Sequence, residues 1–196
     1  MARSSLLAVI VGLFVSTWAQ AGPLANDQVE FGAITSGSTP FDNGGTLKGF
    51  VDWAVYSPGA FPYAGYTPTS GELSYAYQIF VTGAAPLSSF ELVLTEPADN
   101  IGNFALAGGS APASQTLTSM TSAKWTFNGI PTGSNTNGLA FSSPRLPQSL
   151  FATVVDTGQT TFVIPLPSPG PNGIPEPATL SLAAMGCLML GLRRRK

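Results

Sequence analysis

The 196-residue sequence contains no histidine and a single cysteine, Cys187. Without histidine, nucleophilic catalysis by Ser-His-Asp or Cys-His arrangements and histidine-based zinc sites are excluded. Cys187 lies inside an apolar stretch near the C-terminus, so no intrachain disulfide can form. We therefore expect a domain that is held together by its core alone, with no metal site and no cofactor.

Charged residues are also scarce, at 9% of the chain. Five of the eight cations lie at the two ends of the sequence: Arg3, Arg193, Arg194, Arg195 and Lys196. Between residues 22 and 171, three cationic side chains stand against nine acidic ones, a net charge of −6. Because an acidic surface repels phosphate backbones, nucleic acid is not expected as a partner.

The N-terminus has the pattern of a secretory signal peptide. Arg3 supplies the positive charge, residues 6–15 form the apolar region, and Ala19 and Ala21 form the small-x-small cleavage pattern. We predict a signal peptide over residues 1–21 that is cleaved after Ala21, and hence an exported protein. The alternative is an uncleaved N-terminal anchor.

The C-terminus carries a second apolar segment, residues 178–192, followed by the basic tail 193–196. As a helix these fifteen residues would span roughly 22 Å, less than a ~30 Å hydrocarbon core, a difference that snorkelling cations and local thinning can absorb. The positive-inside rule places the basic tail in the cytoplasm. We predict a single transmembrane helix over 178–192, preceded by a Pro/Gly linker over 165–174. The alternative, a buried helix of a soluble domain, is disfavoured because the segment is apolar on every face.

A short motif makes the C-terminal segment specific. Pro175-Glu176-Pro177, the apolar segment and the terminal basic cluster together resemble the PEP-CTERM protein-sorting domain, also known as the ice-binding protein C-terminal domain. The resemblance covers residues 175–196 only. It implies recognition by exosortase, a membrane protease-transferase that cuts near Pro-Glu-Pro and passes the protein to the cell surface or extracellular matrix. The residues to which it assigns the sorting signal are Pro175, Glu176, Pro177, Arg193, Arg194, Arg195 and Lys196.

Between the two signals, residues 22–164 have the alternating patterns and turn residues of an all-β domain. About ten short strands predict an antiparallel two-sheet sandwich, either immunoglobulin-like or a jelly roll. Residues 73–82 and 89–95 are expected to pair as a hairpin, and residues 156–159 to form a tight turn. The predicted strands cover residues 29–35, 46–56, 73–82, 89–95, 103–107, 114–120, 123–128, 139–142, 150–155 and 160–164.

The strand predicted over residues 46–56 carries bulky groups on both faces. Val51, Trp53 and Val55 alternate with Asp52 and Tyr56, which predicts a central strand with both faces covered.

The loop that follows, residues 57–71, is long enough to have a function. Our first ligand hypothesis is therefore an aromatic platform for a sugar ring. It consists of Trp53, Tyr56, Phe61, Tyr63 and Tyr66; the competing interpretation is that these rings close the open end of the sandwich.

The sequence thus predicts an exported, non-catalytic protein of the cell surface or matrix. Its partners would be an exosortase-type protease, the membrane before processing and, as an alternative function, exopolysaccharide bound by a carbohydrate-binding module. A weaker alternative is a glycoside-active enzyme that uses two carboxylates, Asp52 and Glu72. Residues 96–103 also carry oxygen ligands of the kind calcium prefers, although a polar turn explains them equally well.

Overall fold

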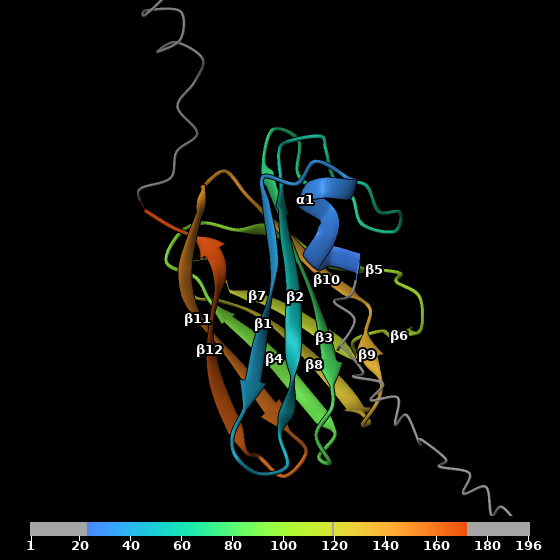
Figure 1. Ribbon diagram of the computed structural model, residues 1–196. Helices are drawn as coiled ribbons and strands as arrows, with labels where there is room; N and C mark the ends of the chain where they lie inside the picture. The colour runs from blue at the N-terminus through green and yellow to red at the C-terminus, as the bar shows by residue number, and fades with distance from the viewer. Residues whose placement is uncertain (1–22, 119, 172–196) are drawn as a thin grey trace, which may run out of the picture.

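The structure, a computed structural model, describes residues 23–118 and 120–171. Two antiparallel sheets pack face to face (Figure 1), so the predicted sandwich is confirmed. The order in the first sheet, sheet A, is β1 (Thr35–Asp42), β2 (Lys48–Tyr56), β3 (Leu73–Val81), β10 (Gly138–Ser143) and β5 (Asp99–Phe104). The short strands β6 (Gly109–Ser110) and β9 (Asn135–Thr136) extend sheet A beside β3.

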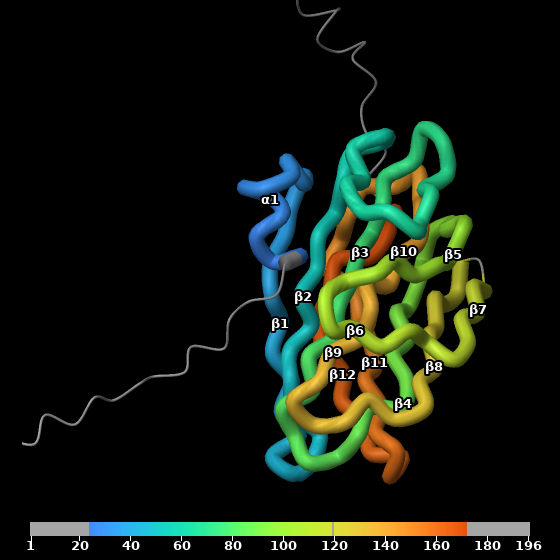
Figure 2. The backbone as a smooth tube through the Cα atoms, turned by 90° about the vertical axis from the view of Figure 1, so that its right-hand side faces the viewer, coloured from blue at the N-terminus to red at the C-terminus, as the bar shows by residue number. Residues whose placement is uncertain are grey.

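The second sheet, sheet B, has the order β12 (Thr161–Pro169), β11 (Pro147–Asp156), β4 (Leu87–Val93), β8 (Ser122–Ile130) and β7 (Ser114–Thr118). The chain passes between the sheets at β3–β4, β4–β5, β6–β7, β8–β9 and β10–β11. A short 3₁₀ helix, η1 (Pro23–Asn26), and the helix α1 (Asp27–Glu30) precede the first strand. They lie beside β1 and β2, on the side of sheet A away from sheet B (Figure 2).

The main core lies between the sheets, where the strand alternation directs apolar side chains inward. In β2, Val51 and Val55 belong to this core, while Ala54 and Tyr56 face the other way, as predicted. In β3, every residue except Phe80 is buried. Both faces of sheet A are therefore covered along β3 and much of β2, and β2 is an inner strand.

A second cluster of buried residues covers the outer face of sheet A. Leu24 and Ala33, from the N-terminal segment of residues 23–34, pack there on residues of β2, β3 and β10. The hydroxyl of Ser36 donates to the carbonyl oxygen of Ala25 at 2.9 Å, and the amide of Ile34 donates to the carbonyl oxygen of Val55 at 2.7 Å. The N-terminal segment is thus an integral part of the fold.

Polar tips of buried aromatic residues connect the two sheets. The hydroxyl of Tyr77, in β3, donates to the carbonyl oxygen of Pro167 in β12. The indole Nε1 of Trp125, in β8, donates to the carbonyl oxygen of Gly102 in β5 at 3.1 Å. Buried tyrosine and tryptophan need such partners, and here the partners lie on the opposite sheet, so these bonds also fix how the sheets are aligned.

Two predicted strand assignments are wrong. The strand predicted over 29–35 is instead the end of α1 followed by an irregular segment, and β1 occupies residues 35–42, where no strand was predicted beyond residue 35. Pro40 is tolerated in β1 because this is an edge strand. The predicted hairpin of 73–82 with 89–95 does not form either, since β3 lies in sheet A and β4 in sheet B. Alternation shows that β3 and β4 direct apolar side chains toward the same core. It does not show whether two such strands pair within one sheet or, as here, face each other from opposite sheets.

The boundary of the predicted linker is also wrong. β12 continues through Pro169, five residues into the segment 165–174. Pro165, Pro167 and Pro169 alternate along this strand, and all three pair with β11 in an unbroken register. Because β12 is an edge strand, the proline nitrogens can face away from β11 without loss of a ladder hydrogen bond. The turn predicted over residues 156–159 does connect β11 to β12.

In the part of the chain that the structure describes, no helix is long and apolar enough to cross a membrane. The predicted signal peptide 1–21, with Ala19 and Ala21, lies outside the described residues. So do the transmembrane helix 178–192, the basic tail 193–196 and the Pro175-Glu176-Pro177 motif.

Packing around one glycine of β2 yields a test of the fold. A Cβ on Gly49 would overlap the carbonyl oxygen of Phe80 and lie 2.6 Å from Cζ of Phe41. We expect Gly49→Ala to lower the free energy of unfolding by about 2 kcal/mol, the usual cost of overpacking, measured by urea denaturation. Gly45→Ala is the control, because its Cβ would meet nothing nearer than the Asn43 side chain at 3.4 Å. Equal effects of the two substitutions would contradict the packing described here.

Candidate functional site

Four of the five aromatic residues singled out from the sequence gather on the outer face of sheet A. Phe61 lies edge-on to Tyr56, Tyr66 and Phe104, with ring centroids 5.3, 5.4 and 5.1 Å apart. Tyr63 stacks on Phe104 at 4.9 Å. The loop of residues 57–72 between β2 and β3 carries three of these rings. We call this group, Tyr56, Phe61, Tyr63, Tyr66 and Phe104, the outer aromatic cluster.

Asp27 forms the polar centre of the outer aromatic cluster. Its Oδ2 accepts hydrogen bonds from the hydroxyls of Tyr56 and Tyr63, the latter at 2.7 Å. The residue is completely buried, and this burial raises the pKa of its carboxyl, although the two tyrosine hydroxyls act to lower it. Burial and the nearby carboxyl in turn raise the pKa of both tyrosines. Asp27 thus fastens the N-terminal segment to the outer aromatic cluster.

Another member of the cluster is fixed to sheet A. The hydroxyl of Tyr66 shares a hydrogen bond of 2.9 Å with Oγ of Ser142, and burial raises the pKa of Tyr66 to about 12. Tyr56 and Tyr66 are buried, while Phe61 and Tyr63 are half-buried. Rings that are packed on one another in this way hold the loop and the N-terminal segment on sheet A. Four of the five rings of the predicted platform are therefore packed on one another on the outer face of sheet A.

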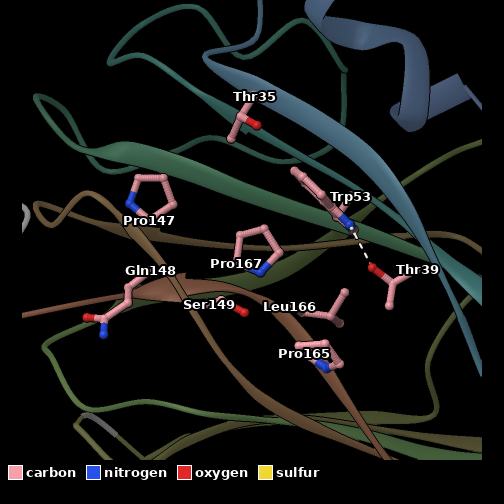
Figure 3. A pocket seen from close by; sticks show the side chains of 9 residues that line it. All are labelled: Thr35, Thr39, Trp53, Pro147, Gln148, Ser149, Pro165, Leu166 and Pro167. Carbon is pink, nitrogen blue, oxygen red and sulfur yellow. Dashed lines mark hydrogen bonds between the residues drawn. The ribbon is translucent and has the colours of Figure 1, made fainter.

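Trp53 lies apart from the outer aromatic cluster. It belongs to the opposite face of β2, where it packs against the main core at the edge of the sandwich. Its Nε1 donates to Oγ1 of Thr39 at 3.1 Å (Figure 3). A Cβ on Gly37 of β1 would lie 2.7 Å from Cζ2 of Trp53, so a glycine at this position allows the indole to lie directly against β1.

The half-buried indole of Trp53 lines a groove of about 310 Å³. Strands from both sheets form it: β1 and β2 from sheet A, and β11 and β12 from sheet B. Because β1 and β12 are edge strands, the groove follows one edge of the sandwich. We call it the Trp53 groove, and its lining consists of Thr35, Thr39, Trp53, Pro147, Gln148, Ser149, Pro165, Leu166 and Pro167 (Figure 3).

A second hollow, of about 480 Å³, lies beside the outer aromatic cluster. It is formed within the loop between β2 and β3, by Pro58, Gly59, Phe61 and residues 67–71. The one aromatic side chain in its lining is Phe61, whose ring already contacts four others. Loop backbone and small side chains make up the remainder of its lining.

The two carboxylates considered for glycoside chemistry are not brought together. Asp52 is buried in the middle of β2, opposite Gln78, whereas Glu72 precedes β3 at the end where Tyr56 pairs with Ser74. They are about six strand residues apart, roughly 20 Å, well beyond the ~5–9.5 Å separation of glycosidase carboxylates. Burial and the charge of Asp99 raise the pKa of Glu72.

The polar residues 96–103 have structural partners. Glu96 forms an ion pair with Arg145 at 3.0 Å, and the side-chain amide of Asn100 donates to the carbonyl oxygen of Thr67. Asp99 and Asn103 lie in β5. Within residues 23–118 and 120–171, no group of three or more acidic, cysteine or histidine side chains is placed to hold a metal ion.

Most of the Trp53 groove was missed from the sequence. Thr35 is the last residue of the strand predicted over 29–35, and Thr39 lies where no strand was predicted. Pro165 and Pro167 lie within the predicted linker. The missed signal is the alternation of proline with Leu166 and Ser168, which are both buried. This period-two pattern is typical of an edge strand rather than an extended linker.

Comparisons with known proteins add little to this description. No family model and no curated protein matches the chain. Among solved structures, the chain is similar to an uncharacterized protein from Nocardia farcinica that is described as having an immunoglobulin-like fold. The match has a TM-score of 0.37 at 10% identity and covers 52% of this chain and 79% of that one. The assignment of a two-sheet sandwich rests on the strand pairing described above.

The buried carboxyl of Asp27 predicts a pH dependence of stability. Because its pKa is raised in the folded state, the folded protein binds the proton more tightly than the unfolded chain, whose aspartates titrate near pH ~4. The stabilisation is present at low pH and is lost as the pH rises through the folded pKa. We expect the denaturation midpoint of Asp27→Asn to fall less than that of the wild type between pH 4 and pH 8.

The control for this experiment is Asp42→Asn. The amide of Gly44 and the ammonium of Lys48 lower the pKa of Asp42, so its contribution is lost only as the pH falls below the unfolded value. This substitution should leave the slope between pH 5 and pH 8 unchanged. If Asp27→Asn keeps the full wild-type slope, the carboxyl of Asp27 does not govern this dependence.

Proposed function

We propose that the chain is an exported, non-catalytic component of the cell surface or extracellular matrix, sorted by an exosortase-type system. The observation that carries this proposal is the Pro175-Glu176-Pro177 motif with its apolar segment and basic tail. Every described strand lies between this motif and the predicted cleavage site at Ala21. In this proposal, the signals at the two ends of the chain direct its export and sorting, and the sandwich between them is the part that is delivered.

We further infer that the sandwich is immunoglobulin-like rather than a jelly roll. The immunoglobulin constant-type arrangement has strands A-B-E-D in one sheet and G-F-C in the other. The order β2-β3-β10-β5 fits the first series, and β12-β11-β4 fits the second, with the lettering in agreement with chain order. In this reading β1 is an addition beside strand A, and the β7–β8 hairpin is an addition beside strand C.

The proposal has a structural rationale in the described residues. The polar tips of Tyr56, Tyr63 and Tyr66 are all engaged with protein partners, and the buried carboxyl of Asp27 is one of them. These bonds tie the N-terminal segment and the loop of residues 57–72 to sheet A. We therefore assign the outer aromatic cluster a structural role in the exported domain.

The test of the proposed sorting is the C-terminus of the protein recovered from its own cells. With wild-type protein, we expect mass spectrometry to find a mature chain that lacks residues 178–196, in the surface or matrix fraction. Replacing Pro175, Glu176 and Pro177 together by alanine should leave the full-length C-terminus in the membrane fraction, because the proposed recognition motif is gone.

The matched control replaces Asn172 and Gly173, which are separated from the motif by Ile174, by alanine. Processing and location should then be those of the wild type. A wild-type protein that keeps residues 178–196 in the membrane would refute sorting by an exosortase and leave a permanently anchored exported domain.

A further inference from the structure

The Trp53 groove has the chemical features of a binding site for an uncharged ligand. None of its nine lining residues is acidic or basic. The indole of Trp53 supplies a flat apolar surface, and Pro147, Pro165 and Pro167 add rigid apolar rings around it. Ligand sites typically combine such an apolar lining with a few polar groups that fix orientation. Those groups are present here as well.

Thr39 is a polar group held ready for a ligand. The indole N–H can only donate, so Oγ1 of Thr39 is the acceptor in its 3.1 Å bond with Trp53. The threonine O–H proton is therefore left to donate elsewhere. Thr35 and Ser149 provide two more hydroxyls, and Gln148 provides an amide. Hydroxyls near an aromatic face match a sugar, which has an apolar ring face and hydroxyls around its rim.

From these observations we propose that the Trp53 groove binds a neutral polysaccharide chain, with one sugar ring on the indole of Trp53 and its hydroxyls bonded to Thr39 and its neighbours. The groove follows an edge of the sandwich, so a long polymer can pass along it. The net charge of −6 between residues 22 and 171 disfavours an anionic polymer. This inference deepens the proposed function, and rests on it for the assumption that the groove meets an extracellular matrix.

A peptide strand is a poorer match for the same edge. Strand addition requires free backbone N–H groups along the edge. In β12, three alternating residues are prolines without a backbone N–H: Pro165, Pro167 and Pro169. The other side of β12 is already paired with β11. Prolines of this kind protect an edge against pairing with another chain. We therefore favour the polysaccharide, and the test also covers the possibility that nothing is bound.

The test is native affinity electrophoresis of the full chain in non-ionic detergent, in gels that contain a polymer. Two neutral probes, galactomannan and hydroxyethyl cellulose, are compared with the anionic polymer alginate. We expect at least one neutral probe to retard the wild type and alginate not to do so. Trp53→Ala should weaken retardation at least about tenfold, because the stacking surface is lost. Thr39→Val should weaken it by about two- to tenfold, the range for one hydrogen bond.

Two controls separate binding from folding. Trp53→Phe keeps a ring beside Gly37 but removes the N–H donor, so it should fold with a thermal midpoint near that of the wild type and retain part of the retardation. Phe61→Leu removes a ring from the outer aromatic cluster and from the second hollow while it keeps an apolar side chain. Its retardation should equal that of the wild type.

Several results would overturn the proposal. These are no retardation by either neutral probe, equal retardation by alginate, or loss of retardation in Phe61→Leu but not in Trp53→Ala. The gels require no cellular processing, so their outcome is independent of whether the C-terminal motif directs sorting. A protein that is sorted as proposed but binds neither neutral probe would refute the groove alone.

Discussion

The structure depends on the burial of sheet A from both sides. β2 and β3 carry apolar or aromatic side chains on each face, and only one face of each strand can meet sheet B. Covering the other face requires the N-terminal segment and the loop of residues 57–72. With no disulfide to constrain the unfolded chain, the fold relies on the apolar surface that this double burial removes from water.

Covering sheet A on its outer face has an electrostatic cost. Asp27 is drawn into the second cluster, where burial opposes its charged form and two tyrosine hydroxyls partly compensate. The benefit is a specific attachment: the carboxyl accepts from Tyr56 in β2 and from Tyr63 in the loop, so one side chain aligns both covering segments with the sheet. Aromatic residues on this face therefore serve the fold, and Trp53, on the other face, remains available at the edge.

Local periodicity was enough to predict the sandwich class and the two faces of β2, because alternation is a property of each strand alone. It failed where the answer depends on a distant partner. β3 and β4 were expected to pair, yet each finds its neighbours elsewhere in the sequence: β3 beside β2 and β10, β4 beside β8 and β11. β1 and the end of β12 were misread because serine, threonine and proline suggest loops, although edge strands admit them.

The same error hid the candidate site. Trp53 was singled out from the sequence, but it was grouped with four rings that lie on the opposite face. Its actual neighbours in the groove are Thr39 and Pro167, which lie 14 positions before and 114 positions after Trp53 in the sequence. Only the antiparallel pairing of β1 with β2, and the packing of sheet B on sheet A, bring them together.

The central claim is that the two aromatic sites have separate roles, one in folding and one in binding. Hydrogen–deuterium exchange of the full chain, with and without a saturating amount of the neutral polymer that retards the wild type, tests it most directly. The account predicts added protection of backbone amides in residues 35–42, 147–151 and 161–168, and none in residues 57–72. Protection confined to residues 57–72 would contradict it and assign binding to the outer aromatic cluster instead.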